Sequence, residues 1–349
     1  MVQNTLYTPK RKIVITSSFE GIVNDGPREC AYISLNAHER MRKAGLLEAK
    51  SFFGKLLEPD EFRTSKETSN STVLKGFLAL RPLVIEAEDY LTVLMALQQC
   101  PRAAEHLANS PSNLNLIDFF THKFNELKAE TAAERAAFRK EFYAERKERK
   151  ESNFKGWLAL QAPFQDTLEQ LRILNTLKTV VGEQVQGGFV LDFVTSKDEL
   201  SVHELCVAFT ELLNIFKPEE IARLPDLNGR NWTDVLQGST SCLISPDRII
   251  GTRAIGKDKV EGPVDRVAQM QEAAKRAGVE PAYVWRVQSV FDPNEIRMLN
   301  EAGFTNQSII TDAYIFPQGY EDARKAGVRI IERGNLAQTL SELAQRMGL

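Results

Sequence analysis

The chain has 349 residues, enough for two domains or for one domain that carries a large insertion. Hydrophobic residues make up 43% and charged residues 26%, so neither disorder nor a fibrous repeat is expected. The formal net charge of -3 argues against general nucleic-acid binding, because phosphate contacts require a concentrated basic surface. An ordinary globular protein is the class that remains.

Cysteine spacing and apolar runs bear on the compartment. The four cysteines form no CxxC pair and no spacing typical of a disulfide-stapled domain, so reduced thiols are expected. No stretch approaches the roughly 20 apolar residues of a membrane span. Residues 1–15 contain no apolar run long enough for a signal peptide. We therefore expect a cytoplasmic protein without a membrane partner.

The first predicted elements are a strand and a long helical module. A short apolar run at residues 12–16 leads into the polar stretch 17–21, as a buried strand leads into a loop. Residues 30–180 are dominated by helix formers at helical spacing. The next apolar strand pattern is at residues 187–194, and a helical pattern follows it. The helical module therefore separates the first strand from the others.

The rest of the chain alternates between strand and helix patterns. Strands are expected at 248–251, 282–287, 308–316 and 328–331, and helices at 264–277, 293–302, 318–326 and 336–347. This alternation predicts an α/β fold, with a Rossmann-like, mainly parallel sheet and helices on both faces, plus a large all-helical cap insertion. The expected core domain comprises residues 1–25 and 185–349, and the helical cap domain comprises residues 26–184. Ligands of such sheets bind beyond the carboxyl ends of the strands.

The most charged part of the helical module is the segment 125–152, and its pattern predicts one long helix. Glu145 and Arg149 stand four residues apart in the order that favours an ion pair. Phe138 and Phe142 share one face of this helix, so they can dock it against another element.

The basic run at 146–150 lies within this predicted helix. It can bind an anionic partner, and the segment 125–152 would then be the surface for a protein partner. Interspersed glutamates cancel much of its field, so a solvated helix face is the alternative interpretation.

The first predicted strand is followed by Ser-Phe-Glu-Gly-Ile-Val-Asn-Asp, residues 18–25. This segment resembles the opening Asp-Phe-Asp-Gly-Val-x-x-Asp signature of the haloacid dehalogenase (HAD) superfamily. In that family the first Asp is the nucleophile and a magnesium ligand, and the Asp two residues later is the general acid and base. The resemblance implies that Ser18 and Glu20 hold the two catalytic positions, in a degenerate member with a large helical cap.

The nucleophile position thus carries a serine where the chemistry needs a carboxylate. A carboxylate is ionised at neutral pH, attacks phosphorus directly and supplies a hard oxygen ligand to magnesium. Ser18 offers a neutral hydroxyl that needs a separate base, and no histidine lies near it in the sequence. Glu20 remains a general acid, but its extra methylene displaces the proton by about 1 Å, which costs roughly a hundredfold in rate.

The family's second motif is a hydroxyl residue at the end of an apolar strand, where the hydroxyl holds the phosphate. Thr195 and Ser196, directly after the strand at 187–194, match this placement. Ser196 and Glu199 also form a capping box for the following helix. The two roles are compatible, because a helix N-terminus favours anions.

The third motif is a lysine near the start of a later helix, which balances the charge of nucleophile and phosphate. Lys259, with Lys257 as the alternative, precedes the helix expected at 264–277. A solvated loop lysine is the competing interpretation. Residues 251–258 are also a near miss for the phosphate-binding loop of nucleotide hydrolases, but Asp258 replaces the Ser or Thr that meets magnesium.

The fourth motif is a strand followed by an acidic pair that completes the magnesium site. Asp292 and Glu295 follow the strand at 282–287, one residue too close together for the family's spacing. Asp292, Pro293 and Glu295 also make a complete helix start, with an N-cap, a proline at the first position and a capping-box glutamate. Both acids are retained as metal candidates, and we expect no metal or a weakly held magnesium ion.

Two functions remain open at this point. In the first, the protein is a catalytically degenerate relative of the hydrolases, a binding or scaffolding module that holds a phosphorylated small molecule. In the second, it is an active magnesium-dependent phosphomonoester hydrolase whose acidic site is altered around Glu20, Asp292 and Glu295. Turnover that depends on magnesium discriminates between them.

Overall fold

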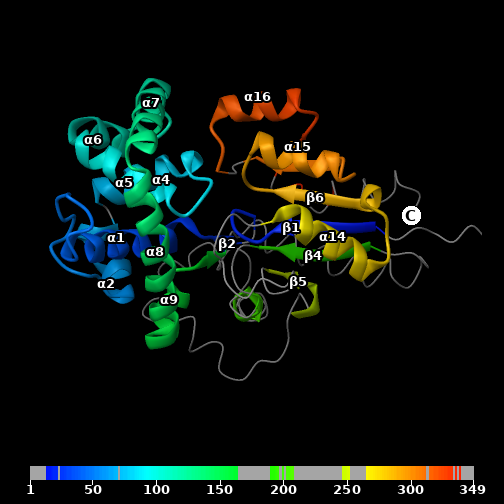
Figure 1. The fold of residues 1–349 in the computed structure, drawn as a ribbon, viewed down its shortest axis with the longest axis horizontal. Coiled ribbons are helices and arrows are strands. Elements are labelled where there is room, and N and C mark those ends of the chain that lie inside the picture. Colours follow the sequence, from blue (N-terminus) through cyan, green and yellow to red (C-terminus); the bar gives the residue numbers. More distant parts are fainter. Residues whose placement is uncertain are drawn as a thin grey trace, which may run out of the picture. The chain divides into compact units, whose positions relative to one another are not determined.

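The structure, a computed structural model, contains two compact units (Figure 1). The α/β unit comprises Met1–Asn24 and Pro163–Leu349, and the helical unit comprises Asp25–Ala162. The residues that the structure describes are 13–22, 24–69, 71–163, 189–195, 199, 202–207, 246–251, 265–311, 314–332, 335 and 338. The second boundary therefore lies at 162–163, whereas the sequence placed the return to the core domain at residue 185.

Six parallel strands form the sheet of the α/β unit within the described part of the chain, in the order β5-β4-β1-β6-β7-β8. They are β1 (Ile13–Ser18), β4 (Phe189–Val194), β5 (Ile249–Ile250), β6 (Val284–Gln288), β7 (Asn306–Ile310) and β8 (Arg329–Ile331). Figure 1 shows β1 between β4 and β6. The prediction of an α/β fold with a mainly parallel sheet and a helical insertion is confirmed.

One predicted strand is wrong in its extent. The pattern indicated a strand at 308–316, but β7 ends at Ile310 and the chain then leads into α16 (Pro317–Lys325). Pro317 opens this helix, and Phe316 before it is extended at φ -70 and ψ 157, because a residue before proline avoids the helical region. The apolar residues Ile315 and Phe316 therefore lie in the connection that precedes α16.

The helices α14 (Arg266–Ala277) and α15 (Pro293–Glu301) agree with the sequence-based expectation. Asp265 caps α14 by accepting a hydrogen bond from the amide of Ala268 at 2.9 Å, and Gly278 ends the helix at φ +68. In Figure 1, α14 lies across β1 and β4. The buried core here contains Val14, Val190, Val194, Ile250, Met270, Ala273, Ala274, Val284, Leu299 and Phe304.

The helical unit consists mainly of α-helices. They are α1 (Pro27–Lys43), α2 (Pro59–Thr64), α3 (Lys66–Ser69), α4 (Thr72–Ala79), α5 (Asp89–Gln99), α6 (Pro101–Asn109), α7 (Leu114–Glu130), α8 (Ala132–Ser152) and α9 (Phe154–Ala159). Two short strands, β2 (Asn24–Asp25) and β3 (Ala162–Pro163), pair with each other where the division between the units falls. Nowhere in the described residues is there a helix with the length and apolar character that a membrane crossing requires.

The predicted single helix over 125–152 is wrong, because α7 and α8 meet at Thr131. This residue is non-helical, at φ -113 and ψ 34, and its hydroxyl donates to the carbonyl of Leu127 at 2.7 Å. A side chain that bonds the preceding turn offers the backbone an alternative to helix continuation. Phe138 and Phe142 are both buried, as expected for a docking face.

The basic run at 146–150 is largely engaged inside the helical unit. Arg146 donates two hydrogen bonds to the carboxylate of Glu29, at 2.8 and 2.7 Å. The expected pair forms as well, since Arg149 Nε donates to Glu145 at 2.7 Å. Two arginines of the run therefore neutralise buried carboxylates instead of facing an anionic partner, and a protein partner for 125–152 stays a prediction.

Candidate functional site

Two of the predicted site residues meet at the carboxyl edge of the sheet. Ser18 is the last residue of β1 and is paired in register with Val194, the last residue of β4. Thr195 therefore emerges beside Ser18 as the two parallel strands end. This is the edge at which ligands of doubly wound sheets bind.

The polar partner of Ser18 is a buried arginine. Arg286 lies on β6 and is 1% exposed, and its Nη2 donates a hydrogen bond to Ser18 Oγ at 2.9 Å. Its Nε and Nη1 have no hydrogen-bond partner in the described structure. Burial, with Arg266 nearby, lowers the pKa of Arg286 to about 10, and Glu295 opposes this shift. The guanidinium therefore remains charged at neutral pH.

The counter-ion of Arg286 is held loosely. Glu295 Oε1 is 3.9 Å from Arg286 Nη2, and Glu295 Oε2 is 3.8 Å from Arg266 Nε. Both distances exceed the range of a hydrogen bond. Within the described residues, the cluster of Arg286, Arg266 and Glu295 thus contains two cations and one carboxylate, and the buried guanidinium makes no direct hydrogen bond to an acid.

Gln288 occupies the end of β6. The register pairs Ser17 with Val287, so Gln288 stands beside Ser18. The resemblance places the acidic pair of the fourth motif in the segment that follows this strand. Gln288 is 1% exposed, and its Nε2 has no hydrogen-bond partner among the residues that the structure describes. A neutral amide thus ends the strand that the family pattern follows with acids.

The magnesium ion that the resemblance implies does not fit these side chains. A hydroxyl, an amide and a buried guanidinium line the ends of β1 and β6, and the guanidinium repels a divalent cation. The described residues contain no group of three or more His, Cys, Asp or Glu side chains that could hold a metal. Glu295, one of the two metal candidates, is instead placed between two arginines.

Asp292, the other metal candidate, caps a helix. Its Oδ1 accepts a hydrogen bond from the amide of Asn294 at 2.9 Å, and Pro293 is the first residue of α15. This is the capping arrangement that the sequence offered as the alternative. Its carboxylate thus serves the helix start.

The loops that follow β1 and β6 are pinned together at Gly21. Ser289 Oγ donates to the carbonyl of Glu20 at 2.7 Å, and the amide of Tyr314 donates to the carbonyl of Ser289 at 2.9 Å. Gly21 has φ +77, and a Cβ there would lie 2.4 Å from Ser289 Cβ and 2.7 Å from Tyr314 Cε2. Glu20, the predicted general acid, is therefore held by its backbone within this fixed loop.

Thr195 is tied into the sheet edge by its backbone. Its amide donates to the carbonyl of Ile250 at 3.1 Å, and its carbonyl accepts from Gln269 Nε2 at 2.8 Å. The other predicted phosphate-binding and charge-balancing residues, Ser196, Lys257 and Lys259, lie outside the described residues. Their roles stay predictions.

Arg286 and Gln288 are the site residues that the sequence patterns missed. One signal could have found them: an arginine lies within the strand predicted at 282–287, and a glutamine directly follows it. Charged residues are almost never fully buried without a partner or a role. Such a strand therefore marks a site.

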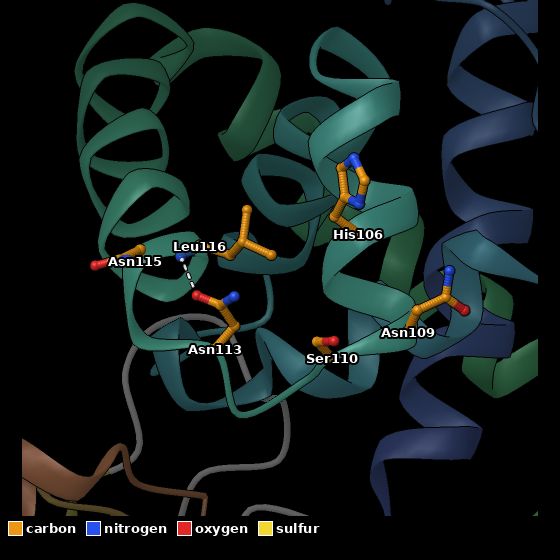
Figure 2. A pocket seen from close by; sticks show the side chains of 6 residues that line it. All are labelled: His106, Asn109, Ser110, Asn113, Asn115 and Leu116. Carbon is orange, nitrogen blue, oxygen red and sulfur yellow. Dashed lines mark hydrogen bonds between the residues drawn. The ribbon is translucent and has the colours of Figure 1, made fainter.

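A separate pocket of about 280 Å³ lies in the helical unit (Figure 2). Its lining is contributed by His106 and Asn109 of α6, Ser110 and Asn113 of the connection, and Asn115 and Leu116 of α7. Asn113 caps α7 by accepting a hydrogen bond from the amide of Leu116 at 3.3 Å. Most of these side chains are exposed, and His106 is the one ionisable group among them.

Comparisons with known proteins yield distant structural matches. No family model and no curated protein match the chain. A HAD family hydrolase from Deinococcus radiodurans R1, solved with bound phosphate and sodium, aligns with 97% of this chain and 98% of its own, at 11% identity and a TM-score of 0.38. A predicted phosphoglycolate phosphatase from Haemophilus somnus 129pt aligns with 95% and 99%, at 13% identity and a TM-score of 0.38. These TM-scores are too low to carry an argument, so the α/β fold rests on the parallel sheet itself.

Proposed function

We propose that the α/β unit is a catalytically degenerate, HAD-like module that binds a phosphorylated small molecule without hydrolysing it through an acyl phosphate. The observation that carries this proposal is the hydrogen bond from the buried Arg286 to Ser18. A cation and a neutral hydroxyl stand where hydrolysis would require a carboxylate nucleophile and its metal.

Ser18 is poorly suited to replace the missing nucleophile. A serine hydroxyl attacks phosphorus only when a base removes its proton. The group that contacts Ser18 Oγ is a guanidinium, which is a donor and cannot accept that proton. The arrangement favours binding an anion over activating a hydroxyl.

The ligand would bind at the carboxyl edge of the sheet. Thr195 is at this edge, and the sequence predicts Ser196 and Lys259, with Lys257 as the alternative, as further contacts to the phosphate. The helical unit would then supply a protein-binding or ligand-screening surface. This function needs neither a metal nor a general acid.

The alternative is a magnesium-dependent hydrolase that uses Glu20 with an altered set of acids. The test is an assay of the purified full chain against a panel of phosphomonoesters, with magnesium and with a chelator. We expect no turnover in either condition. Magnesium-dependent turnover that disappears in the Glu20→Ala variant would overturn the proposal.

A matched control separates chemistry from folding in this assay. Glu301 lies on α15, its side chain is 64% exposed, and it pairs only loosely with Arg297, at 3.5 Å. Glu301→Ala should therefore leave any turnover unchanged, whereas a loss in both variants would point to damage to the protein.

A further inference from the structure

The ends of β1 and β6 present a set of hydrogen-bond donors that lack acceptors. Arg286 and Gln288 are two residues apart on β6, so their side chains share one face of the strand. Arg286 Nε and Nη1 and Gln288 Nε2 have no partner among the described residues. Ser18 accepts from Arg286, which leaves the proton of its hydroxyl to donate.

Leaving such groups buried is costly. An unsatisfied buried donor carries a desolvation penalty of about 1–3 kcal/mol, and a charged donor carries more. A buried guanidinium normally has a carboxylate in direct contact, whereas here the nearest one, Glu295, is 3.9 Å away. An external anion would satisfy the donors and the charge together.

The donors lie together at the carboxyl edge of the sheet. Ser18 and Gln288 are the last residues of neighbouring parallel strands, and the side chain of Arg286 reaches Ser18 Oγ at the same level. This is the edge at which ligands of doubly wound sheets bind.

We infer that Ser18, Arg286 and Gln288 form a metal-independent site for a phosphoryl group. The inference deepens the proposed function, on which it rests, by naming the residues that hold the phosphate. Arg286 supplies the positive charge through Nε and Nη1, and Gln288 and Ser18 supply neutral donors. Glu295 and Arg266 set the remaining charge of the cluster. A phosphoryl group offers at least three acceptor oxygens to these donors, whereas a carboxylate offers two.

The test is calorimetric titration of the full chain with inorganic phosphate, in a chelator and again with magnesium. We expect saturable binding of phosphate when a chelator is present. Magnesium should change the affinity by less than about twofold, because Arg286 supplies the positive charge. Arg286→Met should weaken binding by about tenfold or more, since a hydrogen bond to a charged group is lost. Arg297→Met should have no effect, because Arg297 lies on α15 with its side chain 66% exposed.

A second variant covers the case in which Arg286→Met does not fold. Gln288→Met keeps the volume and the nearby charge but removes the amide donor, so it should weaken binding by about three- to tenfold. Titrations with sulfate and acetate distinguish the ligand class: sulfate should bind and acetate should bind more weakly. Tighter binding of acetate than of phosphate would identify a carboxylate site and overturn the assignment.

The inference fails if phosphate does not bind, if binding requires magnesium, or if Arg286→Met binds phosphate as tightly as Arg297→Met. These outcomes differ from failure of the proposed function, which would appear as turnover of phosphomonoesters. A chain that hydrolyses them but binds phosphate through Arg286 would overturn the non-hydrolytic role and keep the site.

Discussion

Arg286 on β6 donates a hydrogen bond from Nη2 to Ser18 Oγ on β1 at 2.9 Å, across two neighbouring parallel strands. The two residues are 268 positions apart, and each is unusual for its strand. Together they place a positive charge and a neutral hydroxyl at the carboxyl edge of the sheet.

The buried charge of Arg286 should destabilise the folded protein when no ligand is bound. Its guanidinium is fully buried and, within the described residues, makes one hydrogen bond, to a neutral hydroxyl. Arg286→Met should therefore raise the free energy of unfolding by about 1 kcal/mol in phosphate-free buffer, because a desolvated charge is removed. Urea unfolding of the variant and the wild type measures this difference.

Arg286→Met leaves Glu295 without one of its two cationic neighbours, so a second variant is needed as a control. Glu295 is 19% exposed and keeps Arg266 as a neighbour at 3.8 Å, so a cation still lies beside it in the variant. The double variant Arg286→Met with Glu295→Gln removes both charges and should be at least as stable as Arg286→Met. A loss of more than about 1 kcal/mol in both variants would show that the arginine holds the sheet together.

Ser18→Asp restores the acid that the resemblance leads one to expect, yet it should not restore hydrolysis. A carboxylate at position 18 would lie within reach of Arg286 Nη2 and pair with it, instead of binding magnesium. We expect no magnesium-dependent turnover and at least about tenfold weaker phosphate binding, because the new anion occupies the donors. Ser18→Asn has nearly the same size without the charge and should lose less affinity. Turnover by Ser18→Asp would contradict this account of the site.

The sequence predicts the layers of the α/β unit well, because buried parallel strands are continuous apolar runs and the helices carry clear starts. Residues 293–302, with their Asp292 cap, were expected as a helix, and α15 covers Pro293–Glu301. The break at Thr131 is different. Helix formers continue on both sides of it, and the hydroxyl bond to Leu127 that accompanies it is visible only in three dimensions.

The site is less predictable, because it depends on which strands are neighbours. Local patterns alone predict that Ser18 and Thr195 lie at strand ends, where the structure has them. The pairing of β6 with β1 brings Arg286 to Ser18, whereas motif spacing indicates Asp292. Asp292 and Pro293 satisfy a local rule for helix starts, and that rule explains the acid without a metal.

Gly21 should be intolerant of substitution for two separable reasons. It has φ +77, and a Cβ would lie 2.4 Å from Ser289 Cβ in the loop after β6. Gly327 of the same unit has φ +79, and a Cβ there would meet nothing within 4 Å, so Gly327→Ala reports the backbone strain alone. Gly21→Ala should cost about 2 kcal/mol more than Gly327→Ala in urea unfolding. Equal losses of stability in the two variants would mean that the loops after β1 and β6 can move apart without an energetic penalty.

His38 should make the helical unit sensitive to acid. It is buried on α1, 4.9 Å from the ring of Phe52, and in the described structure neither ring nitrogen has a hydrogen-bond partner. Burial lowers the pKa of His38 to about 4, Glu39 opposes the shift and Arg42 adds to it. The unfolded chain takes up this proton near pH 6.5, so stability falls as the pH drops from about 6.5 to about 4, by roughly 3 kcal/mol at most. Urea unfolding across this range should lose that slope in His38→Leu, and an unchanged slope would contradict the assignment.

Asp192 should have the opposite effect in the α/β unit. It is fully buried on β4, and burial raises its pKa to about 6, although Arg248 Nη1 at 3.4 Å opposes the shift. The folded state binds this proton more tightly than the unfolded state, so stability falls as the pH rises from about 4 to about 6, by roughly 2–3 kcal/mol. Asp192→Asn should remove this loss and leave the acid sensitivity due to His38 intact. The two variants should therefore change the pH dependence of the free energy of unfolding with opposite signs over the same range. Changes of the same sign would contradict one of the two pKa shifts.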